Sequence, residues 1–223
     1  MTETVIFSWS GGKDSALALH EIQQNQNYTV FALLTTITKD FDRISMHGVR
    51  RVLLQRQAES IGLPLYEVLI PKNGSNDEYD SIMKEEMIRF REKGISAVVF
   101  GDIFLEDVRK YREGNLSAIN MKAVFPLWMR NTADLAKNFI DRGFKAVVTC
   151  VDSHVLDEEF AGKVIDLRFL SGLHPDVDPC GENGEFHSFV FDGPLFKQPV
   201  KFKKGEVILR DNRFYYCDLR PAD

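Results

Sequence analysis

The sequence predicts an α/β protein with a parallel, five-stranded sheet covered by helices on both faces, followed by a smaller C-terminal α+β lobe. Over the first 125 residues, apolar runs of strand length alternate with segments of helical periodicity, which is typical of parallel strands joined by helical crossovers. These runs are apolar at nearly every position, as expected for strands that are buried on both faces. From about residue 186 onward, short strand signals follow one another without helices between them.

The predicted strands of the parallel sheet are rich in Val, Ile, Phe, Leu and Thr, which favour strands. They cover residues 5–7, 29–37, 65–70, 97–100 and 123–125. Residues 146–151 have the same composition, and we expect them to continue the alternation of strand and helix.

Helices are expected between these strands, over residues 16–22, 48–61, 79–90, 105–117 and 131–140. The second of these helices should end at Gly62, because glycine is the preferred residue just past a helix C-terminus. Ser75 and Glu78 form a capping-box pattern ahead of the third helix. Asn131 is the expected cap of the last one.

The C-terminal part of the chain has a different pattern. Residues 152–179 contain short helical pieces and loops, and residues 186–220 predict antiparallel strands with a hairpin turn at Asp211 and Asn212. We therefore expect an α/β domain over residues 1–125 and a smaller second lobe over residues 126–223. The alternative is that both parts form one compact unit.

Composition excludes several classes of protein. The chain has 223 residues, a net charge of −5 and 44% hydrophobic residues, and it contains no apolar run of the roughly 18 residues that a membrane helix needs. The acidic balance argues against nucleic acid as the main partner. Three widely spaced cysteines without a CxxC pair predict neither disulfides nor a zinc site. The N-terminus does not have the pattern of a signal peptide, so we expect a cytoplasmic protein.

The strongest chemical signal is the string Ser-Gly-Gly-Lys-Asp-Ser at residues 10–15, between the first strand and the first helix. Glycines allow backbone N–H groups to approach a phosphate, and the helix N-terminus attracts anions. Lys13 adds a positive charge, and Asp14 could cap the helix or hold a metal ion on the phosphates. The alternative is a Ser/Gly turn with an ordinary cap. The candidate nucleotide-binding residues here are Ser8, Ser10, Gly11, Gly12, Lys13, Asp14 and Ser15.

A second polar segment lies at residues 178–188, which we call the acidic loop. Glu182 and Glu185 stand three residues apart between glycines, and His187 follows them. Such a loop could bind an amine, ammonia or Mg²⁺, although a Gly-rich acidic turn is also common without any function. Asp102 follows Gly101 at the end of a predicted central strand, where parallel sheets bind their ligands. His47 precedes the second helix and could face the nucleotide.

Residues 10–15 resemble the SGGxDS signature of the PP-loop ATP pyrophosphatases, which are adenine nucleotide α-hydrolase-like proteins with a Rossmann-like fold. The acidic loop resembles the GE-(G/N)-GE-(F/Y) signature of the diphthine–ammonia ligase branch of that family. Further matches to this branch are Met46-His47-Gly48, Gly101-Asp102 with Arg109 and Arg112, and Pro126-Leu127-Trp128. Together the matches extend over about residues 5–197. The resemblance implies that residues 1–125 form the ATP-binding domain and residues 126–223 the substrate lobe.

The resemblance implies that ATP is cleaved between its α and β phosphates, which adenylates a carboxylate that ammonia then converts to an amide. It implies that Lys13 holds the leaving pyrophosphate and that Mg²⁺ is a cofactor, with Asp14 as its candidate ligand. Glu182 and Glu185 are the candidate acceptors for ammonia, and His187 or Glu185 the candidate proton acceptor. The implied acceptor substrate is diphthine on elongation factor 2, in an organism that makes diphthamide.

Two other functions remain open, and so does a homodimer. One is a tRNA-modifying enzyme of the PP-loop family, which the acidic balance disfavours. The other is a protein that binds ATP or AMP without catalysis.

Overall fold

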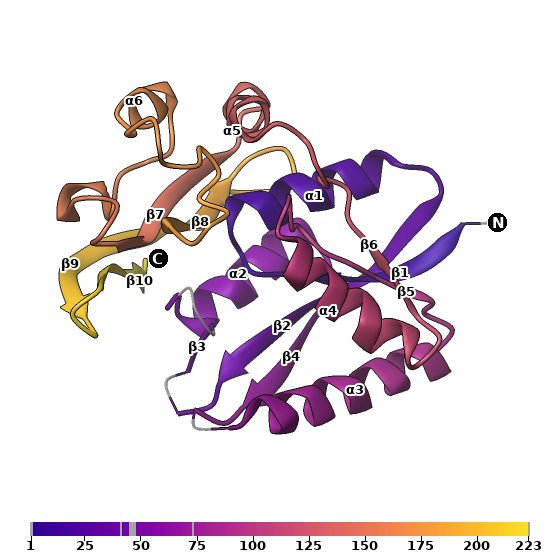
Figure 1. Cartoon of the computed structure of the whole chain (residues 1–223). Coiled ribbons are helices and arrows are strands. Elements are labelled where there is room, and N and C mark those ends of the chain that lie inside the picture. Colours follow the sequence, from indigo (N-terminus) through magenta and orange to yellow (C-terminus); the bar gives the residue numbers. More distant parts are fainter. Residues whose placement is uncertain (1, 41, 45–47, 73, 223) are drawn as a thin grey trace.

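The fold is known from a computed structural model, which describes residues 2–40, 42–44, 48–72 and 74–222. Figure 1 shows two sheets with helices packed around them. The first part of the chain forms β1 (Glu3–Ser8), α1 (Lys13–Gln24), β2 (Tyr28–Thr38), β3 (Arg43–Ile44), α2 (Arg51–Ile61), β4 (Leu65–Ile70), α3 (Asn76–Glu92), β5 (Ala97–Val99), α4 (Glu106–Ser117) and β6 (Lys122–Val124). The second part forms α5 (Thr132–Asp141), β7 (Lys145–Asp152), a 3₁₀ turn (Glu158–Phe160), α6 (Leu167–Ser171), β8 (Phe186–Asp192), β9 (Phe202–Arg210) and β10 (Phe214–Pro221).

The first sheet confirms the predicted five parallel strands. Its parallel pairs give the order β4-β2-β1-β5-β6. The two-residue strand β3 joins it antiparallel to the end of β2. Successive side chains of β1 point to opposite faces of the sheet. Phe7 therefore packs into the core beneath α1 and α2, and Ile6 packs into the core beneath α3 and α4.

The helix ends follow the sequence signals closely. The Ser75 hydroxyl accepts a hydrogen bond from the backbone N–H of Glu78 at the start of α3, and the Asn131 side chain accepts one from Asp134 at the start of α5. Gly62 ends α2 with a φ of 84°, a left-handed conformation that glycine adopts without strain. Helix α2 begins at Arg51, three residues later than expected.

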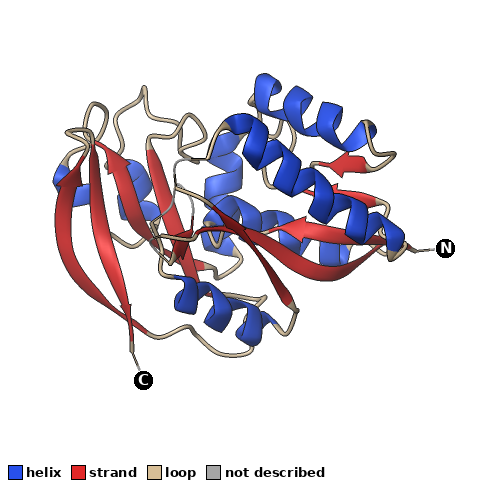
Figure 2. Cartoon of the chain, turned by 90° about the horizontal axis from the view of Figure 1, so that it is seen from below, coloured by secondary structure: helices blue, strands red, loops and turns tan. Residues whose placement is uncertain are grey.

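The second sheet is antiparallel with the strand order β8-β7-β10-β9, and Figure 2 shows it beside the first sheet. It corrects one expectation, because residues 146–151 belong to β7 in this sheet and do not extend the parallel one. Both sheets bury apolar strands, so composition alone could not assign β7 to either. The hairpin between β9 and β10 turns at Asp211 and Asn212 as predicted, with both residues at positive φ.

The topology determines where a ligand can bind. The chain runs from β1 outward to β2 and β4, and then returns to place β5 on the other side of β1. The helices after β1 and β5 pack in opposite cores, α1 with one face and α4 with the other. In parallel α/β sheets this reversal opens a crevice beyond the carboxyl ends of the two central strands. No helix among the described residues is long and apolar enough to cross a membrane.

Candidate active site

Residues 10–15, which we call the cradle, comprise the turn that follows β1 and the first residues of α1, at this crevice. The Ser10 hydroxyl accepts from the Gly12 N–H (3.3 Å) and lies 3.1 Å from the Ser15 hydroxyl, which donates to the Gly12 carbonyl (2.9 Å). The Lys13 N–H donates to Ser188 Oγ of β8 (3.1 Å). The N-cap residue of α1 is Gly12, which has no side chain to accept hydrogen bonds from the N–H groups of the first turn. Ser188 of the second sheet accepts one of these bonds instead.

The Lys13 side chain is buried, with 4% of its surface exposed. Its ammonium group lies 2.7 and 2.8 Å from the two carboxylate oxygens of Asp14, and it also donates to the Cys180 carbonyl. The Phe186 ring is 5.3 Å away. Burial disfavours the charged lysine, but its acidic neighbours, of which Asp14 is the strongest, together outweigh this and raise its pKa above the ordinary value. Lys13 is thus a fixed positive charge where the two sheets meet.

Gly101 and Asp102 also lie at the crevice, directly after β5. A side chain at Gly101 would collide with α1, because a Cβ atom there would lie 2.9 Å from the Ser15 backbone nitrogen. The glycine therefore allows the loop after β5 to pack against the first turn of α1. Asp102 forms an ion pair with Arg112 of α4 (3.1 Å), which packs over the Phe100 ring.

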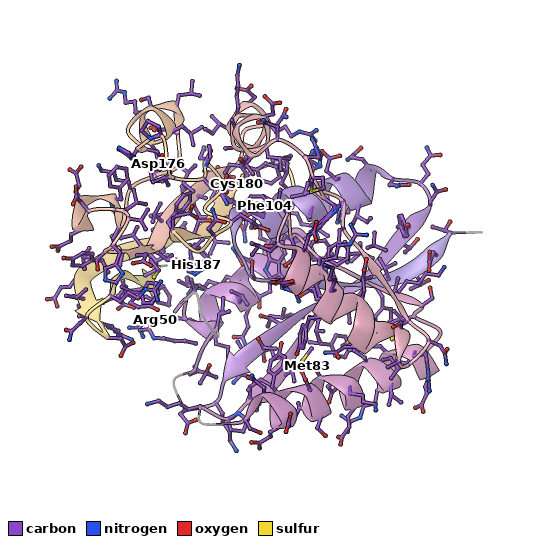
Figure 3. The ribbon with its side chains drawn as sticks, viewed as in Figure 1. Arg50, Met83, Phe104, Asp176, Cys180 and His187 are labelled. Carbon is purple, nitrogen blue, oxygen red and sulfur yellow. The ribbon has the colours of Figure 1, made fainter. Side chains whose placement is uncertain are left out.

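The acidic loop folds back onto this edge of the first sheet. One Glu182 oxygen accepts from the backbone N–H groups of Ile103 (2.7 Å) and Phe104 (3.3 Å). Burial raises the pKa of Glu182 to about 7, against the lowering effect of those two donors. Figure 3 labels Phe104, Cys180 and His187 in the region where the two sheets approach each other.

Glu185 and His187 have different environments. Glu185 is 6% exposed; its Oε1 accepts from the Asp178 N–H (3.0 Å) and from Asn183 Nδ2 (2.9 Å). Its Oε2 is buried without a hydrogen-bond partner among the described residues. Burial, aided by the charge of Lys13, lowers the pKa of His187 to about 4, so the imidazole is neutral at pH 7.

A cavity of about 220 Å³ opens next to the cradle, on the face of the sheet that α3 and α4 cover. Ser8 and Ser10 contribute to its wall from the end of β1, and Thr36 and Phe100 from the neighbouring strands. The wall formed by the two helices consists of Tyr79, Met83, Met87, Tyr111, Arg112, Asn115 and Leu116. In Figure 3, Met83 lies on this helical side, away from Cys180 and His187.

The fold therefore brings the cradle, Gly101, Asp102 and the acidic loop together from three distant parts of the sequence. His47 lies outside the described residues. Within the described part of the chain, no cluster of three or more His, Cys, Asp or Glu residues could hold a metal ion by itself. The roles of Asp14 in binding Mg²⁺ and of the other candidates in binding nucleotide stay predictions.

Several residues at the site escaped the sequence analysis. Gln57 of α2 hydrogen-bonds to the cradle, and nothing in its sequence context distinguishes it from a surface glutamine. The Cys180 carbonyl acts through its backbone, which no side-chain pattern reveals. Tyr79 and Met83 lie in the helix expected over residues 79–90, and the structure places both in the wall of the cavity. The size of the apolar side chains in this helix could have indicated the cavity, because they are larger than packing against a core requires.

Comparison with known proteins shows the family to which the chain belongs. A model of the diphthamide synthase N-terminal domain matches residues 3–122, and one of its C-terminal domain matches residues 131–221. Diphthine–ammonia ligase of Homo sapiens is 26% identical over 90% of this chain and 83% of its own length. That of Danio rerio is 27% identical over 91% of this chain and 88% of its own length.

Among solved structures, U34-tRNA thiolase NcsA from Methanococcus maripaludis superposes with a TM-score of 0.38 and 17% identity, over 62% of this chain and 56% of that chain. The two domain models follow each other in order and together extend over most of the chain, including the cradle and the acidic loop. The chain belongs to the diphthamide synthase family.

Proposed function

We propose that the chain is an ATP-dependent amide ligase of the diphthine–ammonia ligase type. In the first step, an oxygen of a substrate carboxylate attacks the α-phosphorus of ATP, and pyrophosphate leaves. In the second step, ammonia attacks the carbonyl carbon of the acyl-adenylate; AMP leaves, and the nitrogen loses one proton. The observation that carries this proposal is the meeting of the cradle with the acidic loop at one crevice, with Lys13 between them.

The cradle has the groups that a triphosphate requires. The N-terminus of α1 presents backbone N–H groups and the positive end of the helix dipole, and the Lys13 ammonium lies beside them. A positive charge in this position stabilises the negative charge that develops on the phosphates as pyrophosphate leaves. Asp14 offers one carboxylate for Mg²⁺, which proteins commonly hold through one or two carboxylates together with substrate phosphates.

The adjacent cavity suits the nucleoside part of ATP. It combines aromatic and aliphatic walls with a few polar groups, as ligand pockets usually do. Ser10 belongs both to the cavity wall and to the cradle, so a ligand in the cavity can place its phosphates against the N-terminus of α1 without a gap.

Glu182 is our candidate for the proton acceptor in the ammonia step. A general base works best when its pKa lies near the working pH, and burial raises the pKa of Glu182 to about 7. His187 is also unprotonated at pH 7, but with a pKa of about 4 it binds a proton much more weakly. Glu185, with one buried oxygen lacking a partner among the described residues, is the candidate for binding ammonia.

The acceptor that we propose is the carboxylate of diphthine, because the curated relatives are diphthine–ammonia ligases. The test is incubation of the purified protein with ATP labelled in its α-phosphate, ammonium and a diphthine-bearing elongation factor 2. Labelled AMP should form only when ammonium and the acceptor are both present, together with pyrophosphate and an amidated acceptor. Release of ADP and phosphate instead would contradict the proposal, because it places bond cleavage at the γ-phosphate.

A further inference from the structure

Gln57 is fully buried in α2 and connects three segments that are far apart in the sequence. Its Oε1 accepts from the indole N–H of Trp9 (3.0 Å). Its Nε2 donates to the carbonyl of Gly11 in the cradle (3.0 Å) and to that of Val190 in β8 (2.6 Å). The side chain therefore contacts the end of β1, the cradle and the second sheet at once.

These bonds determine the orientation of the amide. A glutamine amide has two N–H donors and one carbonyl acceptor, and Gln57 uses both donors on carbonyls and the acceptor on an N–H group. The flipped amide would direct its oxygen at two carbonyl oxygens and its NH₂ group at the indole N–H of Trp9. All three contacts would then be lost, so the observed orientation is fixed.

The bond to Gly11 also determines the direction of a backbone donor. A trans peptide is planar, and its C=O and N–H bonds point in opposite directions. Because the Gly11 carbonyl points at Gln57, the N–H of Gly12 in the same peptide points away from it, toward Ser10 Oγ (3.3 Å) and the cavity that Ser10 lines. Gly11 has a φ of 77°, and a Cβ atom there would lie 2.7 Å from Gln57 Oε1, so this close contact requires glycine.

We propose that Gln57 is a positioning residue that holds the Gly11–Gly12 peptide with its N–H directed at the phosphates of the nucleotide. The inference rests on the proposed function, because it assumes that the cradle binds phosphate. Gln57 itself does not touch the ligand. Its role is to restrict, together with the Val190 N–H and Ser10 Oγ, the rotation of a peptide in a flexible diglycine turn. The second bond to the Gly11 carbonyl, from the Val190 N–H (2.9 Å), makes the loss of Gln57 a partial one.

The test is Q57M, which keeps the volume of the side chain and removes its hydrogen bonds. Binding of labelled ATP and labelled adenosine is measured by equilibrium dialysis. ATP binding should weaken about tenfold, which corresponds to the loss of one good hydrogen bond. Adenosine carries no phosphate and so does not use the hydrogen bond that Q57M weakens. Its affinity should therefore change by less than about twofold.

Two control variants separate positioning from general stability. W9F removes the hydrogen bond to Gln57 Oε1 and leaves both donors of Gln57 in place. Because Trp9 also lines the cavity, W9F can change the affinity for both ligands, but the ratio of ATP to adenosine affinity should stay as in the wild type. Q55M changes a glutamine of the same helix that donates to Glu67 (3.0 Å), away from the cradle, and should also leave the ratio unchanged. If Q57M does not fold by circular dichroism, Q57E keeps the shape of the side chain and should lower the ratio in the same way.

The outcomes distinguish a failure of the Gln57 inference from a failure of the proposed function. A selective loss of ATP affinity in the Gln57 variant, absent from both controls, supports the inference. Equal losses of ATP and adenosine affinity in the Gln57 variant would show a purely structural role and overturn the inference. The same selective loss of ATP affinity in W9F would also overturn it. If the wild type binds ATP no more tightly than adenosine, the proposed function itself fails. This result is visible before any variant is made.

Discussion

The contact between Gly101 and α1 gives the sharpest single test of the site geometry. An added Cβ atom at Gly101 would lie 2.9 Å from the Ser15 nitrogen, and 3.0 and 3.1 Å from the carbonyl carbon and oxygen of Asp14. All three are backbone atoms in the first turn of α1, which no side-chain rotation can relieve. G101A must therefore displace the loop after β5 or the start of the helix, and with it Asp14 and Ser15.

The expected cost is that of an overpacked core position, about 1–3 kcal/mol. For a chain of this size, roughly 2–4 °C of melting temperature are lost per kcal/mol, so thermal unfolding should shift down by roughly 2–12 °C. Because the displaced groups belong to the cradle, ATP binding measured by isothermal titration calorimetry should weaken as well. Adding saturating ATP should then raise the melting temperature less than it does in the wild type.

Gly114 provides a matched control within the same chain. It lies in α4, where an added Cβ atom would meet nothing within 4 Å. Replacing a helical glycine by alanine stabilises by about 0.5–1 kcal/mol, so G114A should melt slightly higher and bind ATP as the wild type does. If G101A has the same melting temperature and the same ATP affinity as G114A, then Gly101 does not pack against α1 as described.

Three further predictions concern charges. K13A should weaken ATP binding at least tenfold in calorimetry, because it removes the fixed positive charge of the cradle; unchanged binding would show that the phosphates lie elsewhere. At a constant concentration of free NH₃, the rate of amide formation should rise with pH through about 7 as Glu182 loses its proton, and E182Q should lose that rise while still binding ATP; a rise that persists in E182Q under this condition would identify another base. Asp218 of β10 binds Arg43 (3.0 Å) and Arg50 (2.8 Å), which hold its pKa below the ordinary value. D218N should therefore lower the free energy of unfolding at pH 7 by about 1–3 kcal/mol in urea titrations, and this difference from the wild type should shrink as the pH falls below 4. A difference that is the same at pH 7 and below pH 4 would contradict this.

Much of the fold followed from local signals in the sequence. Apolar strand runs, helix caps at Ser75 and Asn131, and the turn at Asp211 act over a few residues, so they can be recognised without knowledge of the partner segments. The expectation that residues 146–151 would continue the parallel α/β pattern was wrong for the complementary reason. A strand buried on both faces has the same composition in either sheet, and the partners of β7 come later in the chain.

The candidate site shows the same division. The cradle and the acidic loop could be predicted as candidates from the sequence alone, because glycines, a lysine and paired carboxylates in short strings have a chemistry that does not depend on the rest of the fold. The contact of Lys13 with the Cys180 carbonyl, the burial that raises the pKa of Glu182 to about 7, and the hydrogen bond from Gln57 to the cradle became visible only in the folded structure. These properties arise from burial and from contacts between distant segments, and neither exists until both sheets have folded against each other.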